Sequence, residues 1–316
     1  MSSTPQTDRE WAIHSINIHG IFFERWCQSV VSESPGWTLN SANYPVEFPP
    51  ANGPIRGKES TLDIRASREV GDVRISLLIE CKKNNPNFVD WVFFQKPGNH
   101  SSSGFIVSQV KNEPRVPPAA GWDTSSSLKH LVTSFPLTDE ARETRGSYGS
   151  LKTSEKTKTS NASIQDAAYQ VALAKQAIAH EDDNISRRLG SFGTPSELPW
   201  RTKLYFPTIV TTARLHVCTF NPEDVDSANG EVPLAKASIS ERQALVFEYA
   251  LPRHLQFAPL DTGSAYSEGL GDLFTRLHIL VVQSQHLPEF LRTFYGQEPD
   301  RNEIPAASGS AVPTDA

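Results

Sequence analysis

The strongest constraint on the fold is a β-hairpin predicted in the first third of the chain. Segment 60–66 alternates apolar and polar residues, and segment 73–82 contains the apolar run Ile-Ser-Leu-Leu-Ile. Both patterns are typical of β-strands. Gly71 and Asp72 lie between the two segments and have the composition of a two-residue hairpin turn. A turn of that length fixes the register of the whole strand pair.

This register brings two carboxylates together. With Val70 opposite Val73, Asp63 lies across from Glu80, and the Cβ atoms of such a pair are roughly 4.5–5.5 Å apart on one face. Lys82 follows Glu80 by two residues and points to the same side. Neighbouring carboxylates raise each other's pKa unless a cation compensates, and Mg²⁺ or Mn²⁺ would do so. The alternative is an ordinary set of cross-strand charges at a solvated strand end.

The rest of the pattern predicts an α/β fold with a mixed sheet. Apolar residues at three- and four-residue steps predict a helix over 11–32, which is followed by a strand around 37–48. Residues 161–179 predict a second helix with Ser163 as its N-cap. The remaining predicted elements are one or two strands over 203–220, strands at 245–250 and 277–283, and a short helix at 288–295.

We expect one domain over residues 11–297. Segment 96–160 has no hydrophobic periodicity and predicts a long flexible insertion. Segment 221–297 predicts a small C-terminal extension of strands and a helix. Residues 1–10 and 298–316 are rich in polar residues and predict disordered ends. The three cysteines show no zinc-ligand spacing, and no apolar run is long enough for a membrane-spanning helix.

The formal net charge of the 316 residues is −6, and the two ends account for most of it. The body of the chain is therefore close to neutral. This balance disfavours a protein that coats nucleic acid nonspecifically, because phosphates attract excess Lys and Arg. The charge balance is compatible with a protein that contacts nucleic acid locally and with the help of a metal ion.

The order of elements and the acidic residues resemble those of the PD-(D/E)XK nuclease superfamily. The resemblance implies a restriction-endonuclease-like core of the order αβββαβ, in which Asp63, Glu80 and Lys82 are the catalytic residues. It further implies that Asp63 and Glu80 bind Mg²⁺ or Mn²⁺ and that Glu24, in the first helix, completes the metal site. A solvated helix position is the alternative for Glu24.

A second motif concerns the substrate. Gln165 and Tyr169 form a QxxxY on one face of the predicted second helix and resemble the motif of RecB-type exonucleases, which contacts the substrate strand. The alternative is a surface glutamine and a packing tyrosine. Just before this helix, Lys152, Lys156 and Lys158 lie in a basic, Ser/Thr-rich segment that would bind a phosphate backbone or serve as a solvated linker.

The resemblance implies a Mg²⁺-dependent deoxyribonuclease that hydrolyses phosphodiester bonds in restriction, repair or phage (antiviral) defence. We expect a cytoplasmic protein with DNA as its partner, working as a homodimer or in a larger complex and without a membrane. The alternative function is a non-catalytic, nuclease-fold binding or assembly module of a multi-protein complex.

Overall fold

The computed structural model describes residues 8–18, 20–48, 58–71, 73–84, 88–96, 107–111, 120–123, 135–144, 162–191, 202–256 and 275–294. Its α-helices are α1 (Asp8–Ile18), α2 (Ile21–Glu33), α4 (Ala162–Ser191) and α6 (Leu287–Thr293). Its strands are β1 (Thr38–Phe48), β2 (Lys58–Val70), β3 (Val73–Lys82), β4 (Asp90–Gln95), β5 (Val107–Lys111), β6 (Ala120–Asp123), β7 (Leu137–Thr144), β8 (Thr202–Thr211), β9 (Arg214–Phe220), β10 (Ala237–Arg242), β11 (Ala244–Ala250) and β12 (Arg276–Gln283). Short 3-10 turns include η4 (Arg253–Leu255).

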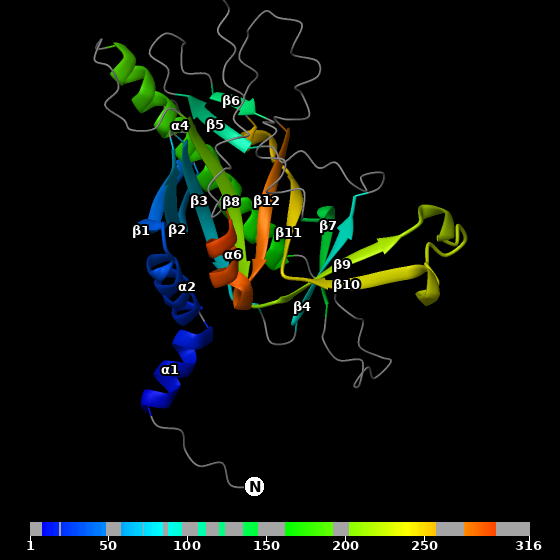
Figure 1. Cartoon of the computed structure of the whole chain (residues 1–316). Helices are drawn as coiled ribbons and strands as arrows, with labels where there is room; N and C mark the ends of the chain where they lie inside the picture. Colours follow the sequence, from blue (N-terminus) through cyan, green and yellow to red (C-terminus); the bar gives the residue numbers. More distant parts are fainter. Residues whose placement is uncertain are drawn as a thin grey trace, which may run out of the picture.

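All these strands belong to one mixed sheet (Figure 1). The hydrogen-bonded order is β1-β2-β3-β8-β12-β11-β7-β4-β9-β10, and the β5–β6 hairpin pairs with the first part of β8. The β3–β8, β8–β12, β7–β11 and β4–β9 pairs are parallel, whereas the other pairs are antiparallel. The predicted α/β class and mixed sheet are therefore confirmed.

One half of the sheet contains β1, β2, β3 and β8, and β4 to β7 come between β3 and α4 in the chain. Strands β1, β2 and β3 form an antiparallel meander. The chain then passes through β4, β5, β6 and β7 before α4 leads into β8, which is parallel to β3. Parallel neighbours need such a long crossover because their connection must return to the same end of the sheet. Their carboxyl ends, Lys82 and Thr211, are paired in the register and lie at one edge of the sheet.

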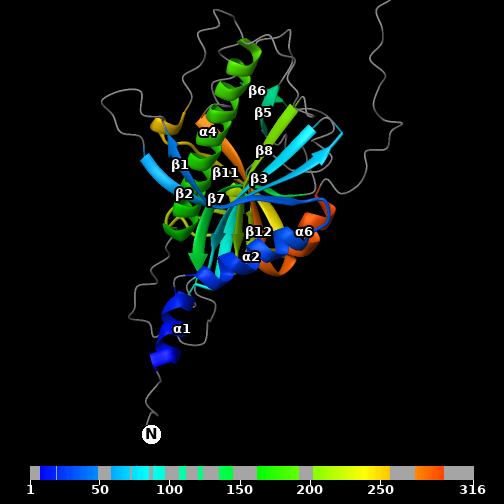
Figure 2. The same cartoon turned by 90° about the vertical axis from the view of Figure 1, so that its left-hand side faces the viewer.

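Separate apolar cores cover the two faces of the sheet. Helix α4 packs on one face through small and branched residues such as Ala168 and Val171, against residues that include Leu78. Helices α2 and α6 cover the other face, where Cys27 packs in the same core as Ile79. Figure 2 shows α4 on one side of the strands, with α2 and α6 on the other. Because Leu78 and Ile79 are consecutive, they point to opposite faces.

The helix predicted over 11–32 is in fact two helices. Gly20 lies between α1 and α2 with a φ of +79°, a left-handed conformation that glycine adopts without steric cost. Helix α2 packs on the sheet through Cys27 and Val31, whereas α1 projects away from it, and Trp11 remains 57% exposed. The break turns the first apolar residues away from the core.

Two predictions, one about the middle and one about the C-terminal part of the chain, are wrong in part. The predicted insertion 96–160 contributes β5, β6 and β7 to the sheet, so it is not unstructured there. The predicted C-terminal extension 221–297 is not peripheral, because β11 and β12 lie between β8 and β7. Strands β4 and β10 were not predicted. The predicted disordered ends, 1–10 and 298–316, lie outside the described residues except for 8–10, which begin α1.

Candidate active site

The β2–β3 hairpin has the predicted register. Val70 pairs with Val73, and the ladder continues to Ile64 opposite Ile79. Gly71 occupies the turn with a φ of +59°. The tight turn and the apolar alternation therefore place the next two residues, Asp63 and Glu80, at the same end of the strand pair.

Asp63 and Glu80 meet where the ladder ends. The Oδ2 atom of Asp63 accepts a hydrogen bond of 2.7 Å from the backbone N–H of Cys81. Glu80 is only 4% exposed, and its Oε2 atom is buried with no hydrogen-bond partner in the part of the chain that the structure describes. A buried carboxylate oxygen normally has a partner, since leaving it unpaired costs about 1–3 kcal/mol. A cation would supply the missing partner.

The pKa values of both carboxyl groups are raised. Burial is the main cause of the raised pKa of Asp63, to about 6, and Glu24 adds to it, while the Cys81 N–H and Lys82 oppose it. Burial also raises the pKa of Glu80, to about 9, with a further contribution from Asp63. Such environments favour the neutral form of a carboxyl group unless positive charge is added. Perturbed groups of this kind are candidates for functional sites.

Lys82 and Glu24 complete the predicted set. Both act electrostatically on Asp63 and Glu80, so the four side chains share one electrostatic environment at the carboxyl end of β3. Glu24 lies in the first turn of α2, where the helix dipole stabilises negative charge. Among the described residues, however, no three His, Cys, Asp or Glu side chains are grouped closely enough to hold a metal ion. Glu24 is therefore near the pair without being placed as a third ligand.

The strand end that carries Lys82 is tied to its neighbours. The carbonyl oxygen of Lys82 accepts a hydrogen bond of 3.3 Å from the backbone N–H of Thr212. The Thr212 hydroxyl in turn accepts a hydrogen bond of 3.0 Å from the backbone N–H of Asn84 and donates one to the side-chain oxygen of Asn84. The next lysine, Lys83, donates to the carbonyl oxygen of Asn17 in α1. These contacts hold the segment after Glu80 against β8 and α1.

The predicted substrate residues are on α4 or are not described. Gln165 and Tyr169 are half-buried on α4, and the Tyr169 hydroxyl lies 3.0 Å from Nε2 of His254 in η4. This contact is with the segment after β11 and not with the carboxylates. Lys152, Lys156 and Lys158 lie outside the described residues.

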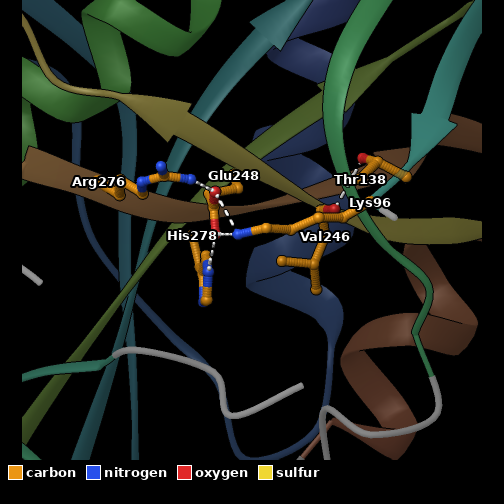
Figure 3. Close-up of polar contacts among 6 residues, drawn as sticks. All are labelled: Lys96, Thr138, Val246, Glu248, Arg276 and His278. Carbon is orange, nitrogen blue, oxygen red and sulfur yellow. Dashed lines mark hydrogen bonds and ion pairs between the residues drawn. The ribbon is translucent and has the colours of Figure 1, made fainter. Parts of the chain in front are cut away.

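Sequence reasoning missed a second polar cluster, on the neighbouring strands β11 and β12 (Figure 3). Both carboxylate oxygens of Glu248 accept hydrogen bonds of 2.9 Å from Lys96, and Arg276 donates to one of them. His278, opposite Glu248 in the register, lies 3.4 Å away. Burial alone would raise the pKa of Glu248, but these hydrogen bonds outweigh it and lower the pKa to about 2. The sequence signal that could have indicated this cluster is the presence of Glu248 and His278 within otherwise apolar strand segments.

Comparisons with protein-family models, with curated proteins and with solved structures find no match for this chain. Among the described helices, none combines the length and the apolar character needed to cross a membrane.

Proposed function

We propose that the protein is a divalent-metal-dependent nuclease that hydrolyses phosphodiester bonds in DNA. The observation that carries the proposal is the buried, unpartnered Oε2 of Glu80 beside the carboxylate of Asp63. A buried carboxylate next to a half-buried one is unfavourable without a counter-ion, and oxygen ligands of this kind suit Mg²⁺ and Mn²⁺. The residues present therefore fit a metal site.

The arrangement of the core supports the same proposal. The elements α2, β1, β2, β3, α4 and β8 occur in the αβββαβ order that we propose for the core, with β3 parallel to β8 and with β4 to β7 inserted between β3 and α4. The acidic pair and Lys82 lie on the second and third strands of that order, as the resemblance to the PD-(D/E)XK superfamily implies. On this basis we also propose DNA as the partner, in restriction, repair or phage defence, with a homodimer or a larger complex as the working form.

The residues divide the chemistry between them. Asp63 and Glu80 would hold Mg²⁺ or Mn²⁺, which when bound lowers the pKa of a water molecule and polarises a phosphodiester oxygen. The ammonium group of Lys82 orients the nucleophilic water and stabilises negative charge on the phosphate in the transition state. Glu24, at the first turn of α2, would add a further carboxylate to the metal site. Gln165 and Tyr169 contact the substrate strand along α4.

A cleavage assay tests the proposal. Plasmid and linear DNA are incubated with the wild-type protein and Mg²⁺ or Mn²⁺, and with the variants Lys82→Ala and Lys83→Ala. We expect cleavage by the wild type and a loss of about 10²–10³-fold in Lys82→Ala, the size expected when a transition-state charge contact is removed. Lys83→Ala is the matched control because this neighbouring lysine is bonded to Asn17 in α1. Absence of cleavage by the wild type with every metal and substrate contradicts the proposal.

The absence of a three-residue metal group within the described ranges favours a second candidate, the non-catalytic assembly module. Calorimetric titration with Mn²⁺ separates the two candidates. Saturable binding that Asp63→Asn removes supports the nuclease. If the protein is the non-catalytic assembly module, we expect that it binds no Mn²⁺ and cleaves no DNA.

A further inference from the structure

A fixed arginine lies next to the edge where β3 and β8 end. Arg214 begins β9 and is opposite Asp90, the first residue of the parallel strand β4. Nε and Nη2 of Arg214 donate to the two carboxylate oxygens of Asp90 at 2.7 and 3.0 Å, and His216 lies 2.9 Å from the same carboxylate. The Asp90 side chain is 13% exposed, whereas that of Arg214 is 50% exposed. A buried carboxylate therefore holds a half-exposed guanidinium in one orientation.

The chain connects this arginine directly to the candidate active site. Lys82 pairs with Thr211, and the next residue, Thr212, donates its N–H to the Lys82 carbonyl oxygen. Arg214 follows two residues later, and its own N–H donates to the carbonyl oxygen of Val89. Figure 1 shows the chain passing from the end of β8 straight into β9, with β4 beginning beside it.

The opposite side of the site is unsuited to a polyanion. A pocket at the ends of β1 and β2 begins two residues from Asp63, and it is lined by Pro45, Val46, Glu47, Glu59, Ser60 and Thr61. Glu47 and Glu59 are directly opposite each other in the β1–β2 register, and the site itself contributes further carboxylates. A phosphate backbone approaching this acidic edge needs an oriented cation, and Arg214 supplies one on the β8–β9 side.

We propose that Arg214, oriented by Asp90, binds a backbone phosphate of the nucleic-acid strand whose reacting phosphate lies at Asp63, Glu80 and Lys82. This assignment rests on the proposed nuclease function and names the substrate contact of the same site. The outer N–H groups of the guanidinium contact the phosphate, while the inner two remain bonded to Asp90. Because Asp90 already fixes the guanidinium group of Arg214, little side-chain freedom is lost when the phosphate binds.

Two substitutions break the same ion pair but change the charge in opposite directions. Arg214→Gln removes a positive charge, whereas Asp90→Asn removes a negative one. A role limited to joining β4 and β9 predicts the same effect from both. A phosphate contact predicts different effects, because Arg214→Gln removes the contact whereas Asp90→Asn keeps the positive charge and removes only its orientation. Glu241→Gln adds a third test, because Glu241 acts electrostatically on Arg214 but is not part of the Arg214–Asp90 ion pair.

The experiment measures binding of a fluorescently labelled DNA duplex of about 30 base pairs by fluorescence anisotropy, at several salt concentrations and in the presence of Mg²⁺. The full chain is used in a Lys82→Ala background to prevent cleavage. We expect Arg214→Gln to weaken binding about 5–10-fold and to reduce the slope of log K against log salt by about 0.9. Asp90→Asn should keep the salt slope of the parent and weaken binding less than Arg214→Gln does, and Glu241→Gln should bind more tightly than the parent. Arg292→Gln, which removes an exposed arginine forked onto Glu289 in α6, should leave the slope unchanged.

Equal weakening by Arg214→Gln and Asp90→Asn, or parent-like binding by Arg214→Gln, overturns the assignment. If Arg214→Gln does not fold, Arg214→Lys replaces it and should keep the salt slope while losing affinity. If the wild type cleaves DNA and Arg214→Gln binds DNA like the parent, the assignment of Arg214 is wrong but the nuclease function is still supported. A parent that binds no DNA, together with an inactive wild type, removes both proposals.

Discussion

Glu80 and Lys175 are both ionisable residues buried in the sheet–helix core, with exposed fractions of 4% and 0%. In each, burial is the main cause of a pKa shift toward the neutral form. Glu80 lies in the candidate site next to Asp63. Lys175 lies on α4, with its ammonium 3.1 Å from the side-chain oxygen of the neighbouring Gln176. Both residues are expected to lower the stability of the fold, and only Glu80 has a proposed function that explains its retention.

Glu80→Gln should stabilise the metal-free protein and remove its response to metal. The amide keeps the shape of the side chain but avoids a second carboxyl group beside Asp63, so we expect a gain of about 1–2 kcal/mol in the free energy of unfolding. Thermal melting in EDTA and in Mn²⁺ measures both effects. The wild type should melt higher in Mn²⁺, and the variant should melt equally in both. A variant that melts below the wild type in EDTA contradicts the explanation.

Lys175→Met should change the pH dependence of stability. Burial lowers the pKa of Lys175 to about 7 in the folded protein, against roughly 10.4 in an unfolded chain. Between these values the unfolded chain binds more protons, so stability from this group rises as the pH increases from 7 to 10. The methionine variant should be about 1–3 kcal/mol more stable at pH 7 and should show a smaller rise toward pH 10. Urea unfolding at pH 7, 8.5 and 10 measures this, and parallel curves for both proteins contradict it.

At the scale of elements, the start of α4 depends on a strand distant in sequence. Oε1 of Glu143, in β7, accepts hydrogen bonds from the backbone N–H groups of Ser163 at 2.8 Å and Ile164 at 3.3 Å. The Glu143 residue is 3% exposed. Ser163 was predicted to cap the helix with its own side chain, but this buried carboxylate satisfies the first N–H groups instead. Helix α4 and strand β7 are therefore stabilised together.

Glu143→Ala should destabilise the protein by about 1–3 kcal/mol, because it leaves two buried N–H groups without a partner. Chemical denaturation followed by far-UV circular dichroism measures the change. Glu140→Ala is the matched control on the same strand, since Glu140 has a 63% exposed side chain and pairs with Arg142. The control should change stability by less than about 0.5 kcal/mol. Equal effects from the two substitutions contradict the capping role.

At the scale of the whole molecule, the sheet joins the two halves of the chain. Strands β11 and β12 lie between β8 and β7, and Glu248 on β11 binds Lys96, which directly follows β4. Residues separated by more than a hundred positions are therefore neighbours. No part of the sheet between β8 and β7 can be removed without exposing apolar strands on both sides.

Truncation tests this organisation. A chain ending at residue 220 lacks β10, β11, β12 and α6, and we expect it to lose its cooperative unfolding transition and its near-UV circular dichroism. A chain ending at residue 297 keeps every described element and should unfold like the full chain. A stable, cooperative 1–220 fragment would show that the C-terminal strands only extend a core that folds without them.

The extent to which the sequence predicted this arrangement depends on how local each signal is. The β2–β3 hairpin was predicted with its register because the Gly71 turn and the apolar alternation act over a few residues. Asp63, Glu80 and Lys82 followed from that register. The role of Glu143 and the positions of β7 and β11 depend on partners far along the chain, and no local periodicity encodes them. The environment of Glu248 was missed for the same reason.

The late position of β12 in the chain also affects the timing of folding. Strand β8 pairs with β3 on one side, and on the other side β5 pairs with residues 202–205 and β12 with residues 208–211. About 65 residues separate the end of β8 from the start of β12. During synthesis, the meander, β5, α4 and β8 leave the ribosome while the second part of this edge of β8 is still open. Such edges pair readily with other chains, so newly made protein is most prone to aggregation until residue 283 has emerged.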